Sequence, residues 1–149
     1  MKTRAQQIMS DKDARTPQEV TQCIHDIAAE FEPYIIKQRR HFHKHPEPSL
    51  AEVRTTSDIA NQLDAMNIPY ERPLKTGLVA TLRGTAPDAY REDGTPRRRI
   101  LLRADIDALP VTEQTGEEFA SVNEGCMHAC GHDCHIAMML GTLQILRHM

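Results

Sequence analysis

Nine consecutive residues, 127–135, concentrate most of the metal-binding chemistry of this sequence. Their order is Met-His-Ala-Cys-Gly-His-Asp-Cys-His, which places three histidines, two cysteines and one aspartate close together. Thiolates and imidazoles are ligands that zinc and similar ions prefer. Gly131 separates Cys130 from His132 and frees the backbone there, so the thiolate and the imidazole can turn toward one ion. The run therefore predicts a metal site, with Cys130 and His132 as candidate ligands.

Two other interpretations of these residues stay open. A buried free cysteine beside an unrelated loop histidine is the simpler one, but the local density of ligands favours a metal. Cys126, Cys130 and Cys134 are also spaced by four, so a structural zinc domain using them with His132 is the alternative. Gly131 disfavours a continuous helix there, and the spacing differs from the CxxC pairs of zinc ribbons. We therefore interpret Cys126 and Cys134 as packing residues.

The residues after this run predict a helix over about 134–148. Apolar side chains recur there at helical spacing, and Asp133 is the expected N-cap. A helix N-terminus stabilises a nearby thiolate or carboxylate. The predicted metal loop therefore leads directly into this helix.

A second group of candidate residues follows an apolar stretch. Residues 100–102 (Ile-Leu-Leu) predict a buried strand that runs out at Asp105 and Asp107. In α/β sheets, ligands gather beyond the carboxyl ends of strands. Two aspartates separated by one residue point to the same side of a strand and can bind a cation or orient a metal-bound histidine. Two solvated aspartates at a turn are the alternative interpretation.

The remaining sequence predicts helices and short strands. Thr16-Pro-Gln-Glu19 is a capping box that starts a helix, which Pro33 kinks or divides and which ends at His45-Pro46. Residues 49–52 (Ser-Leu-Ala-Glu) predict a second capping box, followed by a helix to about residue 67. Short strands are expected at 68–72 and 78–83. We expect the alternating His41, His43 and His45 to be solvated or structural, because the sequence fixes no carboxylate partner for them.

Composition limits the possible partners and the cellular location. A chain of 149 residues with a net charge of −3 and scattered basic residues does not suggest nucleic acid or an anionic membrane as a partner. No apolar run is long enough to span a bilayer, and residues 1–15 are polar, without the hydrophobic centre of a signal peptide. We therefore expect a cytoplasmic protein with a flexible leader over 1–15 and reduced cysteines.

Five segments, taken together, resemble the M20 metallopeptidase family. They are residues 40–47 (RHFHKHPE), 76–80 (TGLVA), 103–110 (RADIDALP), 119–121 (FAS) and 127–133 (MHACGHD). The resemblance is to the amidohydrolase subgroup that includes hippurate hydrolase, N-acyl-amino-acid deacylases and auxin-conjugate hydrolases. It implies an α/β fold with helices packed on a mixed sheet. Residues 16–149 would be the N-terminal portion of the catalytic domain, without the lid or dimerisation domain.

The resemblance also implies an activity and its cofactors. The complete enzyme would use two divalent ions, zinc or manganese, to release an amino acid from an N-acyl-amino acid or a related amide. Cys130 and His132 fall on two metal-ligand positions of the family, and Asp107 falls on a catalytic aspartate that orients a metal-site group. Asp105 stands where other branches of the family carry a ligand histidine. The full-length protein is expected to be a homodimer or higher oligomer.

The family's general-base glutamate and its further ligands have no counterpart in the sequence. The expectation is therefore an N-terminal fragment of a hydrolase that is inactive alone. The alternative is a non-catalytic structural zinc-binding or interaction module.

Overall fold

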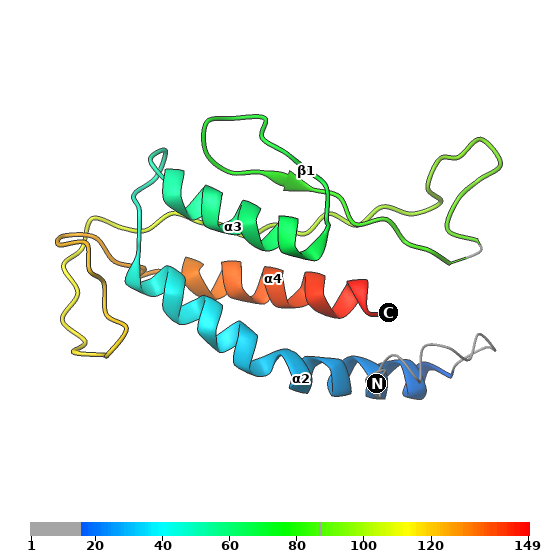
Figure 1. Ribbon diagram of the computed structural model, residues 1–149, viewed down its shortest axis with the longest axis horizontal. Coiled ribbons are helices and arrows are strands. Elements are labelled where there is room, and N and C mark those ends of the chain that lie inside the picture. The colour runs from blue at the N-terminus through cyan, green and yellow to red at the C-terminus, as the bar shows by residue number, and fades with distance from the viewer. Residues whose placement is uncertain (1–15, 87) are drawn as a thin grey trace.

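Three helices lie side by side in the computed structural model, which describes residues 16–86 and 88–149. The chain order is α2 (Pro17–Lys44), α3 (Val53–Met66), β1 (Tyr70–Glu71), β2 (Val79–Ala80) and α4 (His132–Arg147). Figure 1 shows α4 between α2 and α3. The leader expected over 1–15 lies outside the described residues. Within the described part, no helix combines the length and apolar character that crossing a membrane requires.

Helix α2 begins and ends where the sequence predicts. Thr16 and Glu19 form the capping box: the Thr16 backbone N–H donates to the Glu19 carboxylate at 2.8 Å, and the Glu19 N–H donates to the Thr16 hydroxyl at 3.3 Å. The helix continues through Pro33 and does not divide there. It ends at Lys44, where His45 donates its backbone N–H to the carbonyl of Phe42.

Helix α3 has a different start from the one expected. The predicted capping box at 49–52 is wrong: Glu52 occupies the N-cap position, and its side chain makes no capping hydrogen bond. Instead the Glu47 carboxylate accepts the backbone N–H groups of Arg54 at 3.1 Å and Thr55 at 2.7 Å. These are first-turn N–H groups without partners in the helix, so a carboxylate before the helix takes the role of the cap.

The main hydrophobic core joins all three helices. Its buried members are Phe42 of α2, Ile59, Leu63 and Met66 of α3, Ile68, and Ile136 and Leu140 of α4. Gly141 of α4 is buried where the helix meets α2, and a Cβ atom built on it would lie 2.6 Å from Cδ1 of Ile35. The absence of a side chain at Gly141 therefore sets how closely α4 approaches α2.

The sheet is small, and one expected strand is not formed. Strands β1 and β2 pair antiparallel, with Tyr70 opposite Ala80, so both strands expected over 68–72 and 78–83 are present in shortened form. The buried strand predicted from residue 100 is wrong, because 100–107 has no strand partner among the described residues. Ile100 and Leu101 are 86% and 90% exposed. The apolar pattern alone does not bury a strand that lacks a neighbour.

Short pairings nevertheless bring the two candidate site segments together. Ala108 donates its N–H to the carbonyl of Glu47 at 2.8 Å, and Leu109 pairs with Met127 in an antiparallel bridge. This bridge holds the segment after Asp107 beside the segment before Cys130. The site is therefore assembled from local contacts and not from a sheet edge.

A buried group of charged side chains also connects α4 to α2. Asp133, in the first turn of α4, accepts a hydrogen bond from His43 Nδ1 at 2.7 Å and forms an ion pair with Arg39, whose Nε lies 3.1 Å from Asp133 Oδ2. His43 Nε2 lies 3.0 Å from Glu113 Oε1. We call these four residues, Arg39, His43, Glu113 and Asp133, the anchor cluster. Two acidic and two basic side chains compensate one another there, as buried charges require.

The electrostatics of Glu113 show how strongly this cluster holds a carboxylate. Burial raises the pKa of Glu113, but hydrogen bonds from the Thr115 hydroxyl, the Ser121 backbone and His43 outweigh it and bring the pKa down from 4.5 to about 2. Glu113 therefore remains ionised in the folded protein over most of the acidic range.

The close approach of α4 to α2 at Gly141 predicts how Gly141→Ala changes the free energy of unfolding. The sign of this change depends on whether the side chain of Ile35 is present. Overpacking costs roughly 1–3 kcal/mol, and alanine in place of glycine favours a helix by about 1 kcal/mol. Gly141→Ala is therefore expected to lower the free energy of unfolding by about 1 kcal/mol. In an Ile35→Ala background the same change should instead raise it, since the contact is gone. Urea denaturation of the four proteins measures both effects, and stabilisation in both backgrounds would show that Ile35 simply moves aside.

The low pKa of Glu113 predicts a specific acid sensitivity. Because its folded-state pKa is depressed, the ionised carboxylate contributes its full stabilisation above about pH 4.5, and this contribution is lost as the pH falls toward about 2. The free energy of unfolding of the wild-type chain should fall more steeply across this window than that of Glu113→Gln. Parallel pH dependences, measured by denaturant titration, would contradict the assignment.

Candidate metal centre

His132 is the best-oriented candidate ligand. It is the first residue of α4, and its Nδ1 lies 2.9 Å from both the carboxylate Oδ1 and the backbone carbonyl of Asp107. Both partners are acceptors, so Nδ1 carries the proton and Nε2 is the nitrogen with a free lone pair. No hydrogen bond to Nε2 is found within residues 16–86 and 88–149. This arrangement, with a carboxylate holding the far side of a histidine, is typical of metal-binding imidazoles.

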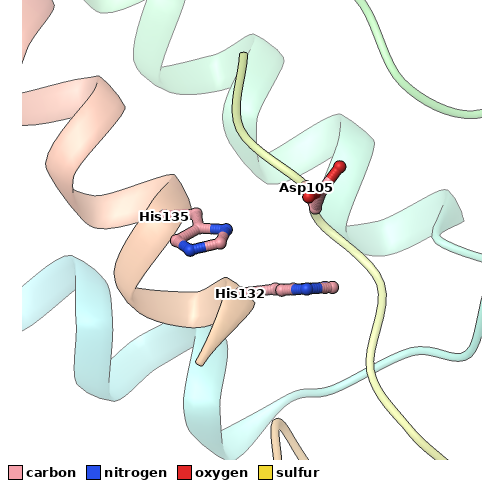
Figure 2. A group of neighbouring side chains, drawn as sticks. All are labelled: Asp105, His132 and His135. Carbon is pink, nitrogen blue, oxygen red and sulfur yellow. The ribbon is translucent and has the colours of Figure 1, made fainter. Parts of the chain in front are cut away.

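Two further donors lie beside His132. Ligand atoms of Asp105, His132 and His135 lie within 4.8 Å of one another, close enough to hold one ion. Figure 2 shows both histidines projecting from α4 toward the segment that carries Asp105. Their rings are stacked, with centroids 5.2 Å apart. Two imidazoles and a carboxylate form a donor set that suits zinc or manganese, so the residues present fit a divalent ion.

The charge on Asp105 is maintained by its neighbour. Arg103 donates two hydrogen bonds to Asp105 Oδ1, at 2.6 Å from Nη2 and 3.0 Å from Nε. The hydrogen bond from Arg103 is the main cause that holds the pKa of Asp105 below its usual value. Asp105 and Asp107 therefore take different partners: one pairs with an arginine, and the other fixes His132.

An open cavity of about 390 Å³ adjoins these donors. Its lining includes Asp105 and His135, together with Leu102, Arg103, Met138, Met139 and Thr142. The cavity has both charged and apolar walls.

The cysteines take different positions from that of His132. Cys130 is exposed, whereas Cys126 and Cys134 are half-buried, and all are free thiols. Within the described residues, the one group of three or more histidine, cysteine, aspartate or glutamate side chains able to hold a metal contains none of them. The structure thus brings Asp107 to His132 and leaves Cys130 nearby on the same loop but outside the donor group.

The helix start differs from the prediction in a way that affects the site. Gly131 occupies the N-cap position of α4 with a φ of 79°, in the left-handed region. Asp133 was expected to be the N-cap of α4. It is instead a first-turn residue whose side chain is only 1% exposed. Because glycine adopts this backbone conformation without steric cost, Gly131 allows the sharp turn between Cys130 and His132.

Sequence reasoning missed three contributors to this region. His135 was left unassigned, although its spacing of three from His132 places both rings on one face of a helix. The pairing of His43 with Asp133 joins residues 90 positions apart, and no sequence signal announces it. His128 is buried and both of its ring nitrogens lack a partner among the described residues, while burial lowers its pKa. His128 therefore adds a buried polar side chain without a hydrogen-bond partner to the loop before His132, in addition to the donor group of Asp105, His132 and His135.

Comparisons with known proteins point to one family of hydrolases. Residues 101–149 match the family described as Peptidase family M20/M25/M40. The chain is 45% identical over 121 residues to the N-acetylcysteine deacetylase of Bacillus subtilis, covering 78% of this chain and 29% of that protein. It is 39% identical over 131 residues to the N-acyl-L-amino acid amidohydrolase of Geobacillus stearothermophilus, covering 87% and 32%.

A solved structure shows the same fold. The YXEP protein of Bacillus subtilis, described as a dinuclear metal binding peptidase from the M20 family, matches with a TM-score of 0.69 and 42% identity, over 79% of this chain and 31% of that one. The α/β fold expected from the sequence is thereby confirmed for the part that the chain covers. The chain spans about 30% of the length of these relatives. Together these matches place the chain in the Peptidase family M20/M25/M40, of whose members it covers a part.

Proposed function

We propose that this chain is part of a metal-dependent amidohydrolase that releases an amino acid from an N-acyl-amino acid. The observation that carries the proposal is the pairing of Asp107 with His132, which leaves Nε2 of the imidazole free beside two more donors. Two relatives at 45% and 39% identity bear the names of an N-acetylcysteine deacetylase and an N-acyl-L-amino acid amidohydrolase. Chemistry and relatives therefore support the same reaction class.

The residues of this chain supply part of the catalytic machinery. We assign Cys130 and His132 as metal ligands and Asp107 as the catalytic-site aspartate that fixes the tautomer of His132. Two divalent ions, zinc or manganese, when bound, would polarise the scissile carbonyl and activate a water. Asp105 and His135 line the same space and add a carboxylate and an imidazole that can bind an ion or the water bound to it. Hippurate is one candidate substrate within the N-acyl-amino-acid class.

The setting of the protein is also a proposal. We infer a cytoplasmic enzyme that acts on a small molecule, without nucleic acid or membrane as partner, and that assembles into a homodimer or higher oligomer in its full-length form. The low net charge and the scattered basic residues support the absence of a polyanionic partner.

The alternative is a structural zinc module built on Cys126, Cys130, Cys134 and His132. Its four ligands would have to converge on one ion in a closed tetrahedral set. The donor group found in the described residues uses Asp105 and His135 with His132 and contains no cysteine. The geometry therefore favours the hydrolase, because two of these donors, Asp105 and His135, line an open cavity.

Substitution of the two assigned ligands should weaken metal binding. In Co²⁺ titrations of the chain, His132→Ala is expected to lower the affinity at least about tenfold, and Cys130→Ser to remove the thiolate-to-cobalt charge-transfer band. Cys126→Ala and Cys134→Ala are matched controls that should leave both unchanged. A charge-transfer band that persists in Cys130→Ser would refute the cysteine assignment, and its loss in the two controls would support the structural zinc module.

Residues 1–149 alone are expected not to hydrolyse N-acetyl amino acids or hippurate. Metal-assisted hydrolysis needs ions held by a sufficient ligand set and a base near the water. Only two assigned ligands belong to this chain, and no residue in it matches the family's base glutamate. The assay uses the purified chain with added Zn²⁺ or Mn²⁺ and N-acetylcysteine. Turnover that depends on metal and disappears in Cys130→Ser would show that the chain already contains a complete site.

A further inference from the structure

Two adjacent residues at the start of α4 are held from opposite sides. His132 is fixed by Asp107 of the 105–107 segment, with 2.9 Å between Nδ1 and Oδ1. The next residue, Asp133, is held by α2. The backbone between these two side chains has little freedom, because rotating it would break contacts on one side or the other. The direction of the His132 ring therefore depends on how firmly Asp133 is held.

In the described part of the chain, the hydrogen bond and the ion pair of the Asp133 side chain both come from α2. Its Oδ2 lies 2.7 Å from His43 Nδ1 and 3.1 Å from Arg39 Nε, and the side chain is 1% exposed. Its other oxygen, Oδ1, has no hydrogen-bond partner in the part of the chain that the structure describes. Arg39 is the more exposed of the two partners, with 34% of its side chain accessible. His43 is consequently the buried contact that orients the Asp133 carboxylate.

His43 is itself held on its other side. Its Nε2 lies 3.0 Å from Glu113 Oε1, so the ring bridges two carboxylates. Each ring nitrogen of His43 therefore faces a carboxylate oxygen. Phe119 packs edge-on against the ring with centroids 5.5 Å apart, and the Arg39 guanidinium lies 4.8 Å from the Phe119 centroid. The ring is thus fixed in direction as well as in place.

We propose that His43 is a positioning residue for the metal centre, acting through Asp133 to fix the first turn of α4 and so the ring of His132. This inference rests on the proposed function, because it assumes that His132 is a ligand. Neither the resemblance of the sequence nor the comparisons assign a role to His43. Within the described residues, the polar contacts of its ring go to Asp133 and Glu113 and not to Asp105, His132 or His135, so it acts through Asp133.

Packing alone does not account for these charged groups. Burying ionised side chains carries a desolvation cost, and apolar residues of similar volume are often as good or better for stability. The core of α2 and α4 already contains Phe42, Ile136 and Leu140. The directional hydrogen bond to Asp133 fixes the orientation of the backbone next to His132, which apolar packing does not do. Contacts behind metal ligands typically affect metal affinity by 10–100-fold.

The test compares His43→Gln with His41→Gln. His41 lies on the same helix, and its Nε2 pairs with Asp58 Oδ2 at 2.8 Å in a half-exposed position. His43→Gln thus removes two imidazole–carboxylate pairs, with Asp133 and Glu113, whereas His41→Gln removes one, with Asp58. Two measurements are made on the 149-residue chain: Co²⁺ affinity by titration, and the tautomer of His132 in the metal-free protein from long-range ¹H–¹⁵N spectra of the histidine rings at alkaline pH.

We expect wild-type and His41→Gln to show His132 protonated at Nδ1 and to bind Co²⁺ within about twofold of each other. His43→Gln should show a mixture of His132 tautomers and Co²⁺ affinity at least about tenfold weaker. A folded His43→Gln with an unchanged tautomer and affinity would overturn the proposal, even if its melting temperature fell. Where His43→Gln does not fold, Asp133→Asn is tested in its place with the same expected changes and the same overturning result.

The two readouts also separate this inference from the proposed function. A tautomer change in His43→Gln, in a chain whose Co²⁺ binding does not depend on His132, would support the positioning role and reject His132 as a ligand. A Co²⁺ affinity that depends on His132 but not on His43 or Asp133 would support His132 as a ligand and reject the positioning role of His43.

Discussion

The first turn of α4 depends on a buried carboxylate. Asp133 is shielded from solvent, and its Oδ1 has no hydrogen-bond partner among the described residues, so His43 and Arg39, both at Oδ2, supply its charge compensation. Removing one partner of a buried pair leaves an uncompensated charge, which typically costs about 3–5 kcal/mol. The position of α4 on α2, and with it the position of His132, therefore follows from an electrostatic requirement as much as from apolar burial.

The charge compensation of Asp133 helps to explain how Asp107 and His132 meet, although residues 100–107 form no strand in the described part of the chain. In α/β proteins the donors at strand ends are normally aligned by the ladder between neighbouring strands. Here residues 100–107 have no ladder in the described part of the chain, and Ile100 and Leu101 are exposed. Asp107 still reaches His132, because the Leu109–Met127 bridge and the anchor cluster fix the two ends of the arrangement. Local contacts are thus sufficient to orient His132 and its carboxylate partner, Asp107.

The features that the sequence predicts correctly depend on residues close together in the chain. The Thr16–Glu19 capping box and the helix end before Pro46 are each contained in a few residues. The wrong predictions concern competition between local and distant partners. A capping box over residues 49–52 was expected to start α3, but the Glu47 carboxylate accepts the first-turn N–H groups instead. Asp133 was expected as the N-cap of α4, but its side chain is buried against His43 and Arg39. A partner 90 residues away gives no periodicity or spacing that a single sequence displays.

Asp107 and Asp133 fix different parts of His132 at the start of α4, and this affects how the metal site is completed by the rest of the enzyme. His132 has its tautomer set by Asp107 and its backbone set by Asp133, so its lone pair is directed before any ion arrives. An imidazole held in this way loses little conformational entropy on binding, and a hydrogen bond to the nitrogen that does not bind the ion fixes the ring for metal binding. The chain spans 29% and 32% of two relatives, and in our proposal the remaining ligands and the base belong to the rest of the enzyme. Donors contributed by distant segments would then meet a histidine whose orientation this part of the fold has already determined.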